Sequence, residues 1–130
     1  MKKRVAILCT CMLWCGILLC AQNISGGVID AFKQGNAESL VGYLDSKVEL
    51  VIDSRVLKSD KQAVGKQLAA FFTKHKVDGF LLNHQGQRNE SGFMVGTLTT
   101  SSGVFRVNCF LRKSGSQYVI HQIRINASNE

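Results

Sequence analysis

Four side chains of this sequence could support chemistry in a shared pocket. His84 and His121 each lie in a segment that alternates apolar and polar residues, and an imidazole in a pocket can titrate near neutral pH and act as a general base. Tyr43 could serve as a second polar group beside such a base, because its hydroxyl both donates and accepts hydrogen bonds. We therefore name Tyr43, His84, Cys109 and His121 as candidate pocket residues, and we assign no catalytic residue.

Each candidate also has an ordinary structural interpretation, which the sequence favours. A histidine on an apolar strand face is more often a hydrogen-bonded part of the packing than a ligand or a base. Tyr43 and Asp45 could form an acid–base pair, but a tyrosine at a helix end usually packs its ring. Asp45 and Ser46 would then satisfy backbone groups of the turn.

Motifs for a metal, a phosphate or a nucleophile are missing from the sequence. The three histidines at positions 75, 84 and 121 have no metal-ligand spacing, and Ser25-Gly26-Gly27 is not followed by the Lys-Ser/Thr pair of a phosphate-binding loop. No serine nucleophile elbow is present. We therefore predict no metal and no cofactor.

The first residues predict export. Met1-Lys2-Lys3-Arg4 precedes an apolar run over residues 5–19, which is shorter than a spanning helix, and Ala21 supplies a small residue for cleavage. We predict a signal peptide over residues 1–21 and a periplasmic or secreted protein. Cys20 raises the alternative of a lipid anchor, but Leu19 before it is larger than the residue that the lipoprotein peptidase prefers.

Removal of residues 1–21 changes the composition. Four of the five cysteines are lost, so Cys109 is predicted to be either buried and inert or paired with another chain, with burial favoured. Three of the 16 Lys and Arg residues are also lost, so 13 basic residues remain beside 9 acidic ones and the formal net charge is 13 − 9 = +4. No basic run or aromatic ladder remains, which argues against nucleic-acid binding. The length of residues 22–130 suits a single domain.

The pattern along the chain predicts helices first and a sheet after them. Two helices are expected within residues 24–44, separated by a break at 33–36 where Asn36 can cap the second helix. A strand is expected over 48–52, and a helix begins at Ser59-Asp60 and ends before 74–76. Four strands then follow over 79–85, 92–100, 104–112 and 117–125, and their short connections predict an antiparallel meander in an α+β fold.

Strand alternation predicts which residues face the helices. One set is Phe105, Val107, Cys109 and Leu111; the matching set in the last strand is Val119, His121, Ile123 and Ile125. The opposite face of the last strand would carry Tyr118, Ile120, Gln122 and Arg124. Because His84 alternates in phase with Phe80 and Leu82, both His84 and His121 are predicted to line the space between sheet and helices.

Several short segments together resemble a known family. They are Gly35-Asn36-Ala37, residues 43–50, Phe71-Phe72, His84-Gln85-Gly86, Gly96-Thr97-Leu98, Tyr118-Val119-Ile120 and Ile123-Arg124-Ile125. This chain resembles the small secreted bacterial proteins called domain of unknown function 4783, which look like members of the nuclear transport factor 2-like superfamily. The resemblance implies a cone in which N-terminal helices cover a strongly bent antiparallel sheet. Because that superfamily holds isomerases, dehydratases and non-enzymatic modules, the fold does not choose a function.

Two functional hypotheses follow. The first is a non-enzymatic exported module that binds a small apolar or amphiphilic ligand or a protein partner, such as an envelope protein. A homodimer through the sheet is one form of it, if Phe110, Tyr118 and Ile120 share the outer face. The second is an isomerase-like or lyase-like enzyme with His121 as general base and Tyr43 as a second polar group. We predict no membrane span.

Overall fold

The computed structural model describes residues 26–128, so the predicted signal peptide over 1–21 lies outside the described residues. The helices are α2 (Gly26–Gln34), α3 (Ala37–Val41) and α4 (Lys61–Lys74). The strands are β1 (Leu44–Ile52), β2 (Arg55–Asp60), β3 (Val77–Arg88), β4 (Ser91–Thr100), β5 (Gly103–Ser114) and β6 (Gln117–Ala127). Among these residues no helix is long and apolar enough to cross a membrane.

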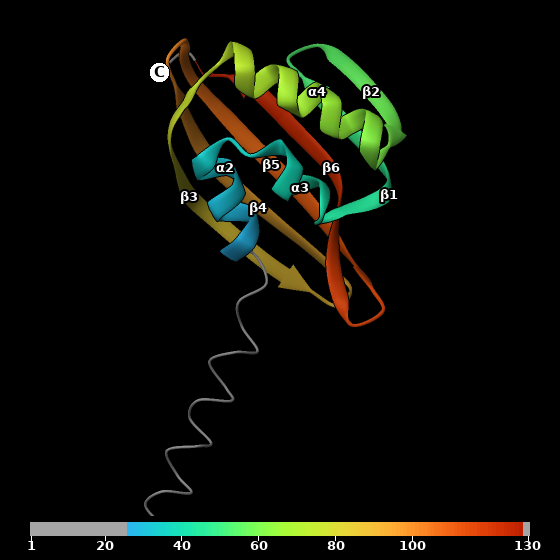
Figure 1. Ribbon diagram of the computed structural model, residues 1–130. Helices are drawn as coiled ribbons and strands as arrows, with labels where there is room; N and C mark the ends of the chain where they lie inside the picture. The colour runs from blue at the N-terminus through green and yellow to red at the C-terminus, as the bar shows by residue number, and fades with distance from the viewer. Residues whose placement is uncertain (1–25, 129–130) are drawn as a thin grey trace, which may run out of the picture.

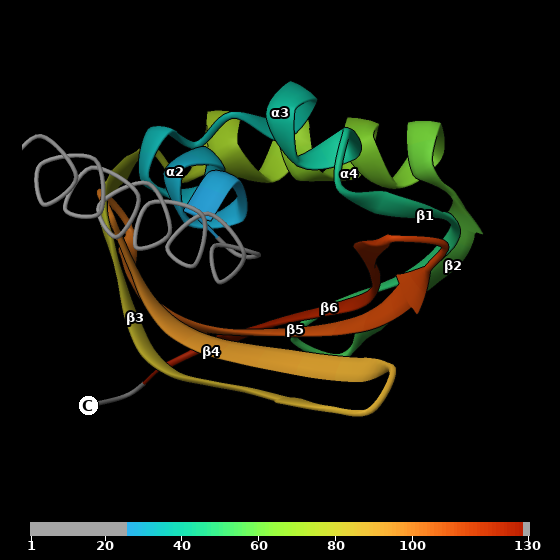
Figure 2. The ribbon, with the colours of Figure 1, turned by 90° about the horizontal axis from the view of Figure 1, so that it is seen from below.

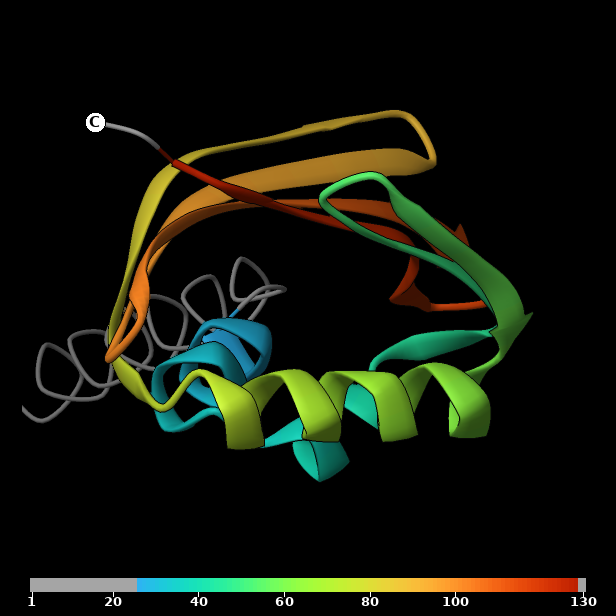
Figure 3. The ribbon, with the colours of Figure 1, turned by 90° about the horizontal axis from the view of Figure 1, so that it is seen from above.

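The strands form one bent sheet in the order β2-β1-β6-β5-β4-β3. Neighbouring strands are antiparallel except for β1 and β6, which run parallel. The helices lie on the concave side of the sheet, with α4 running along the open side and α2 and α3 packed beside it (Figures 1 and 2). Figure 3 shows the same two layers from above, with the turn between β3 and β4 far from the helices. The predicted α+β cone is confirmed.

Local capping explains where the helices begin and end. Gly35 adopts a φ of 61°, and the amides of Gly35 and Asn36 donate to the carbonyls of Phe32 and Ala31, which is the Schellman ending of a helix. Asn36 then caps α3, since its Oδ1 accepts the Ser39 amide at 3.1 Å. The predicted break and cap are therefore confirmed.

The helix predicted to begin near residue 60 is also present. Asp60 Oδ1 accepts the Ala63 amide at 2.8 Å, which satisfies one of the free donors in the first turn of α4. The apolar face of α4 is buried against the sheet; its buried residues are Val64, Gly65, Leu68, Phe71 and Phe72.

The strand β2 was not predicted from the sequence, and β1 begins at Leu44 rather than at residue 48. β2 follows β1 after a tight turn in which Asp53 has a φ of 55°. Most residues of β2 are exposed and several are charged, so the segment lacks the apolar alternation that indicates a strand. β2 forms because its backbone pairs with β1 along its whole length, from Lys47 opposite Asp60 to Ile52 opposite Arg55.

The core fills the space between the helices and the sheet. Its central members are fully or almost fully buried: Phe32, Leu40, Leu68, Met94, Leu98, Val107, Cys109, Ile120, Ile123 and Ile125. The prediction that Phe105, Val107, Cys109 and Leu111 face the helices is confirmed by their burial. Within the described chain, Thr100 is the buried polar residue.

The predicted facing of β6 is wrong for its first half. The register between β5 and β6 shifts after Phe110, which is opposite Gln122, so that Leu111 is opposite Ile120 and His121 is the extra residue of a β-bulge. Ile120 is 0% exposed and packs inside, and Tyr118 packs against the core, whereas His121 is exposed on the outer face. The bulge reverses the alternation that the sequence pattern assumes.

A second bulge turns His84 outward in the same way. Leu82 is opposite Gly96 and His84 is opposite Val95, which leaves Asn83 as the extra residue of β3. Phe80 is buried and Leu82 is half-buried, but His84 is exposed and contacts the Phe93 ring at a centroid distance of 5.3 Å. Neither histidine therefore faces the helices, contrary to the sequence prediction.

The bulge at His121 makes a testable prediction about stability. Ile120→Ala should lower the free energy of unfolding by about 2–5 kcal/mol, because it opens a cavity in the core. His121→Ala should change it by less than about 0.5 kcal/mol, because the imidazole is exposed. Urea unfolding of the two variants measures both values. A larger loss of stability in His121→Ala than in Ile120→Ala would contradict the bulge and indicate that His121 faces the core.

Candidate functional site

The corner between α3 and β1 positions Tyr43. The Tyr43 amide donates to the Leu40 carbonyl at 2.9 Å, and its own carbonyl accepts the Ile120 amide of β6 at 2.8 Å. Its phenol end lies against Gly27 of α2, where a Cβ atom would sit 1.8 Å from the phenol oxygen. A glycine is needed there because any larger residue would displace the tyrosine ring.

The β5–β6 hairpin brings the second tyrosine close to this corner. Gly115 adopts a φ of 64° in the turn between Ser114 and Gln117. Tyr118, directly after the turn, packs against the core, and its hydroxyl donates to the Asn89 carbonyl of the β3–β4 turn at 3.3 Å. These are the two tyrosines of the chain.

Together these elements enclose an open groove of about 810 Å³, which we call the tyrosine groove. Its lining residues are Glu38, Ser39, Gly42, Tyr43, Lys113, Ser116, Gln117, Tyr118 and Val119. α3 and the α3–β1 corner supply one wall, and the β5–β6 hairpin supplies the other.

The groove combines aromatic surface with polar and charged groups. Tyrosine rings offer apolar area together with a hydroxyl, and Ser39, Ser116 and Gln117 add donors and acceptors. Glu38 on one wall and Lys113 on the other have opposite charges. Such a surface suits a small ligand with both apolar and polar parts.

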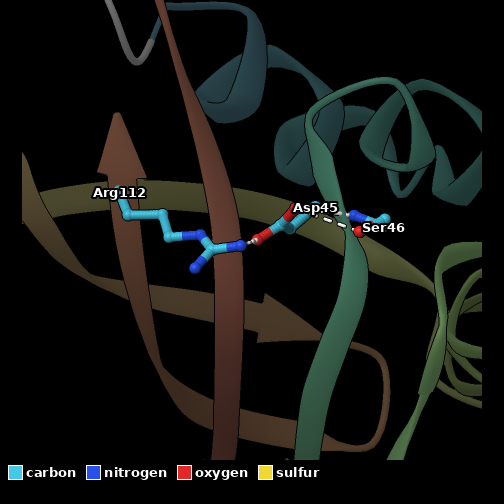
Figure 4. A network of polar contacts seen from close by, with 3 residues as sticks. All are labelled: Asp45, Ser46 and Arg112. Carbon is cyan, nitrogen blue, oxygen red and sulfur yellow. Dashed lines mark hydrogen bonds and ion pairs between the residues drawn. The ribbon is translucent and has the colours of Figure 1, made fainter. Parts of the chain in front are cut away.

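Asp45 forms a polar contact beside the corner rather than a pair with Tyr43. Its Oδ2 lies 2.5 Å from Arg112 of β5, and its Oδ1 accepts the Ser46 amide at 2.7 Å. Figure 4 shows the Arg112 side chain reaching toward Asp45 across the ribbon of β6. The Asp45 side chain is only 12% exposed, so this contact joins β1 to β5 over the strand between them.

The four candidate pocket residues do not form one site. Tyr43 lines the tyrosine groove, and Cys109 is fully buried in the core opposite Met94 and Ile123. His84 and His121 are exposed on the outer face, on strands that β4 and β5 separate. The two bulges account for this dispersal.

Sequence reasoning missed Tyr118, Glu38 and Lys113 as neighbours of Tyr43. Tyr118 was assigned to the outer face because the bulge at His121 leaves no mark in the apolar pattern. The sequence did contain one signal, since each tyrosine lies just after the end of a predicted helix or hairpin turn, at Gly42-Tyr43 and at Gln117-Tyr118. No group of three or more potential metal ligands occurs among residues 26–128.

Comparison with known proteins gives both a family and a fold. The family model described as domain of unknown function DUF4783 matches residues 25–126. A DUF4783 family protein from Bacteroides ovatus is 53% identical, with a TM-score of 0.81 over 84% of this chain and 99% of that chain. Another from Bacteroides uniformis is 52% identical, with a TM-score of 0.81 over 83% and 100% of the two chains.

A more distantly related structure shares only the fold with this chain. A protein of the NTF2-like family from Streptomyces avermitilis is 12% identical, with a TM-score of 0.63 over 82% of this chain and 93% of that chain. The nuclear transport factor 2-like fold is thus shared well beyond the sequence family. No protein with a curated description matches the chain.

Cys109 yields a prediction for pH dependence. Burial raises the pKa of its thiol from 9.0 to about 12, because the thiolate is disfavoured away from water. Above about pH 9 the thiol loses its proton in the unfolded chain but keeps it in the folded chain. The contribution of the protonated thiol to the free energy of unfolding is therefore full below pH 9 and declines as the pH rises toward 12. The slope should reach about 1.4 kcal/mol per pH unit.

The measurement compares unfolding free energies of the wild type and Cys109→Ala from pH 7 to pH 10.5. Their difference should change only above pH 9, because the alanine variant lacks the titrating group. The folded wild type should also resist alkylation at pH 8 and react once denatured. Rapid alkylation of the folded protein would contradict the burial.

Proposed function

Since the chain belongs to the domain of unknown function 4783 family, we propose a function from its own geometry: an exported, non-enzymatic module that binds a small ligand in the tyrosine groove. The observation that carries the proposal is the groove itself, where both tyrosines of the chain meet two opposite charges in a space of about 810 Å³. That volume falls in the range of small-molecule sites.

The distribution of polar groups supports this location. Between sheet and helices the described side chains are closely packed and almost wholly apolar, with Leu68, Leu98 and Ile123 at 0% exposure. A ligand there would have to displace core side chains, at the cost of their packing. The groove instead lies outside the core and offers aromatic surface without disruption.

The alternative of an enzyme with His121 as general base loses its geometric support. That mechanism needs the imidazole beside Tyr43 in a pocket, and His121 is exposed on the outer face of β6. Within the groove, Glu38 and Lys113 are the charged groups, and neither has an orienting hydrogen bond among the described residues. A general base normally has such a partner.

Export is part of the proposal because a basic start, an apolar run and Ala21 form a signal-peptide pattern. The protein recovered from the periplasm of its own cells should then begin at Gln22 and carry no lipid. Native mass spectrometry of that material reports the mature mass and any retained ligand in one spectrum.

A matched pair of serine variants tests the groove. Ser116→Trp places a bulky ring in the β5–β6 turn at the groove, whereas Ser102→Trp makes the same change in the exposed β4–β5 turn. We expect a noncovalent ligand mass on the wild type and on Ser102→Trp, and about tenfold less of it on Ser116→Trp. Equal occupancy of the two variants, or no retained mass on the wild type, would contradict ligand binding in the groove.

A homodimer through the outer face of the sheet is a second candidate. Of the three residues expected to form its interface, Ile120 and Tyr118 belong to the core side, so only Phe110 remains on the outer face. Phe110 lies directly opposite Phe93, and Val95 follows on the same face of β4; all three are half-buried. This smaller apolar patch could pair with a second copy.

Light scattering at high protein concentration tests the dimer. Phe110→Lys should convert a dimeric wild type to the monomer, because a charge would be buried at the contact. Val56→Lys is the control, since Val56 is 65% exposed on β2 at the far edge of the sheet. A monomeric wild type at several hundred micromolar would remove this candidate.

A further inference from the structure

The outer face carries a polar depression that neither function above uses. It measures about 500 Å³ and is lined by side chains from four adjacent strands. Thr97 on β4 lies opposite Arg106 on β5, and Arg106 lies opposite Asn126 on β6, so the three form one row across the sheet. Asn83 on β3 joins them from the bulge, and Ser128 closes the end.

The bulge in β3 prepares one side of this depression. Asn83 Nδ2 donates to Thr97 Oγ1 at 2.7 Å. Because the Thr97 oxygen already accepts this bond, its hydroxyl hydrogen is available to donate onward, and Asn83 Oδ1 stays available to accept. The pair therefore presents one donor and one acceptor in fixed positions.

Arg106 supplies a positive charge that no acidic side chain of the described part of the chain pairs with. The ion pair found within residues 26–128 joins Arg112 to Asp45, so the Arg106 guanidinium keeps its five donors free there. Arg124 on β6 lies opposite Asn108, which makes it a diagonal neighbour of Arg106 on the same face, and it too has no ion pair with any of the described residues. Two guanidinium groups so placed repel each other and attract an anion.

One carboxylate contacts the rim of the depression. Asp53 Oδ1 accepts the Ala127 amide at 3.0 Å, so this oxygen is engaged by the backbone. Exposed arginines can also serve merely to keep a sheet soluble. What distinguishes Arg106 is its place in a depression between an Asn–Thr pair and a second asparagine.

We propose that this depression binds a hydroxylated ligand that bears one oxyanion, such as a sugar acid or a sugar phosphate. The planar guanidinium of Arg106 takes the oxyanion through two parallel hydrogen bonds. Thr97, Asn83 and Asn126 take the neutral hydroxyls, because amides and hydroxyls both donate and accept. This site lies on the outer face, separate from the tyrosine groove at the α3–β1 corner.

Isothermal titration calorimetry with four probes tests the proposal: galacturonate, galactose 6-phosphate, galactose and inorganic phosphate. At least one acidic sugar should bind, at least about tenfold more tightly than galactose and than inorganic phosphate. The stronger of the two acidic sugars identifies a carboxylate or a phosphate as the natural oxyanion. Amide chemical shifts of Asn83, Thr97 and Asn126 should move on binding.

The variants separate specific contacts from charge alone. Arg106→Gln should weaken binding of the acidic sugar at least about tenfold, and Arg106→Lys should weaken it less, because it keeps the charge but not the fork. Thr97→Val, a second and nearly isosteric change, should weaken it severalfold. Arg88→Gln on the exposed end of β3 and Ser116→Trp in the tyrosine groove should have no effect.

Three results would overturn the proposal. They are no saturable binding of either acidic sugar below about 10 mM, unchanged binding in a folded Arg106→Gln, and binding of inorganic phosphate as tight as that of galactose 6-phosphate. Ser116→Trp blocks the tyrosine groove and leaves the outer-face depression intact. Normal sugar binding by this variant therefore tests the depression independently of the function proposed for the tyrosine groove.

Discussion

The parallel pairing of β1 with β6 holds the two parts of the sheet together and places the helices. It is the sheet contact that joins the N-terminal part of the described chain to the C-terminal meander. Polar contacts hold it where the register is irregular: the Ile120 amide to the Tyr43 carbonyl at one end, and Gln122 to Glu49 at 2.8 Å further along. Because β1 directly follows α3, this pairing fixes the helices over the concave face of the sheet, and with them the position of Tyr43.

The two β-bulges decide which chemistry each face can offer. Regular strands would have placed both His84 and His121 among the core side chains, where burial disfavours a charged imidazole. The extra residues at Asn83 and His121 turn both rings outward and admit Ile120 and Tyr118 on the inner side. A bulge also bends its strand, so the same features that curve the sheet around the helices keep its interior apolar.

An apolar interior leaves the edges and the outer face of the sheet as the places where polar side chains gather. The tyrosine groove forms where a helix end meets a hairpin, and the Arg106 depression forms where a bulge meets the end of β6. Both lie where side chains can be polar without disturbing the packing of Leu68, Leu98 and Ile123. The fold shared with distant NTF2-like proteins therefore does not by itself indicate a function, because the buried core maintains the fold while the two depressions are formed by residues at its borders.

Local spacing and local hydrogen bonds are enough to predict the helices with their caps at Asn36 and Asp60, the four-stranded meander and the burial of Cys109. The other features depend on contacts between distant segments. β2 forms because β1 offers it a partner, not because its own residues are apolar. The faces of His84, Tyr118 and His121 depend on single-residue register shifts, and these arise from pairing between strands that the apolar pattern of one strand cannot record.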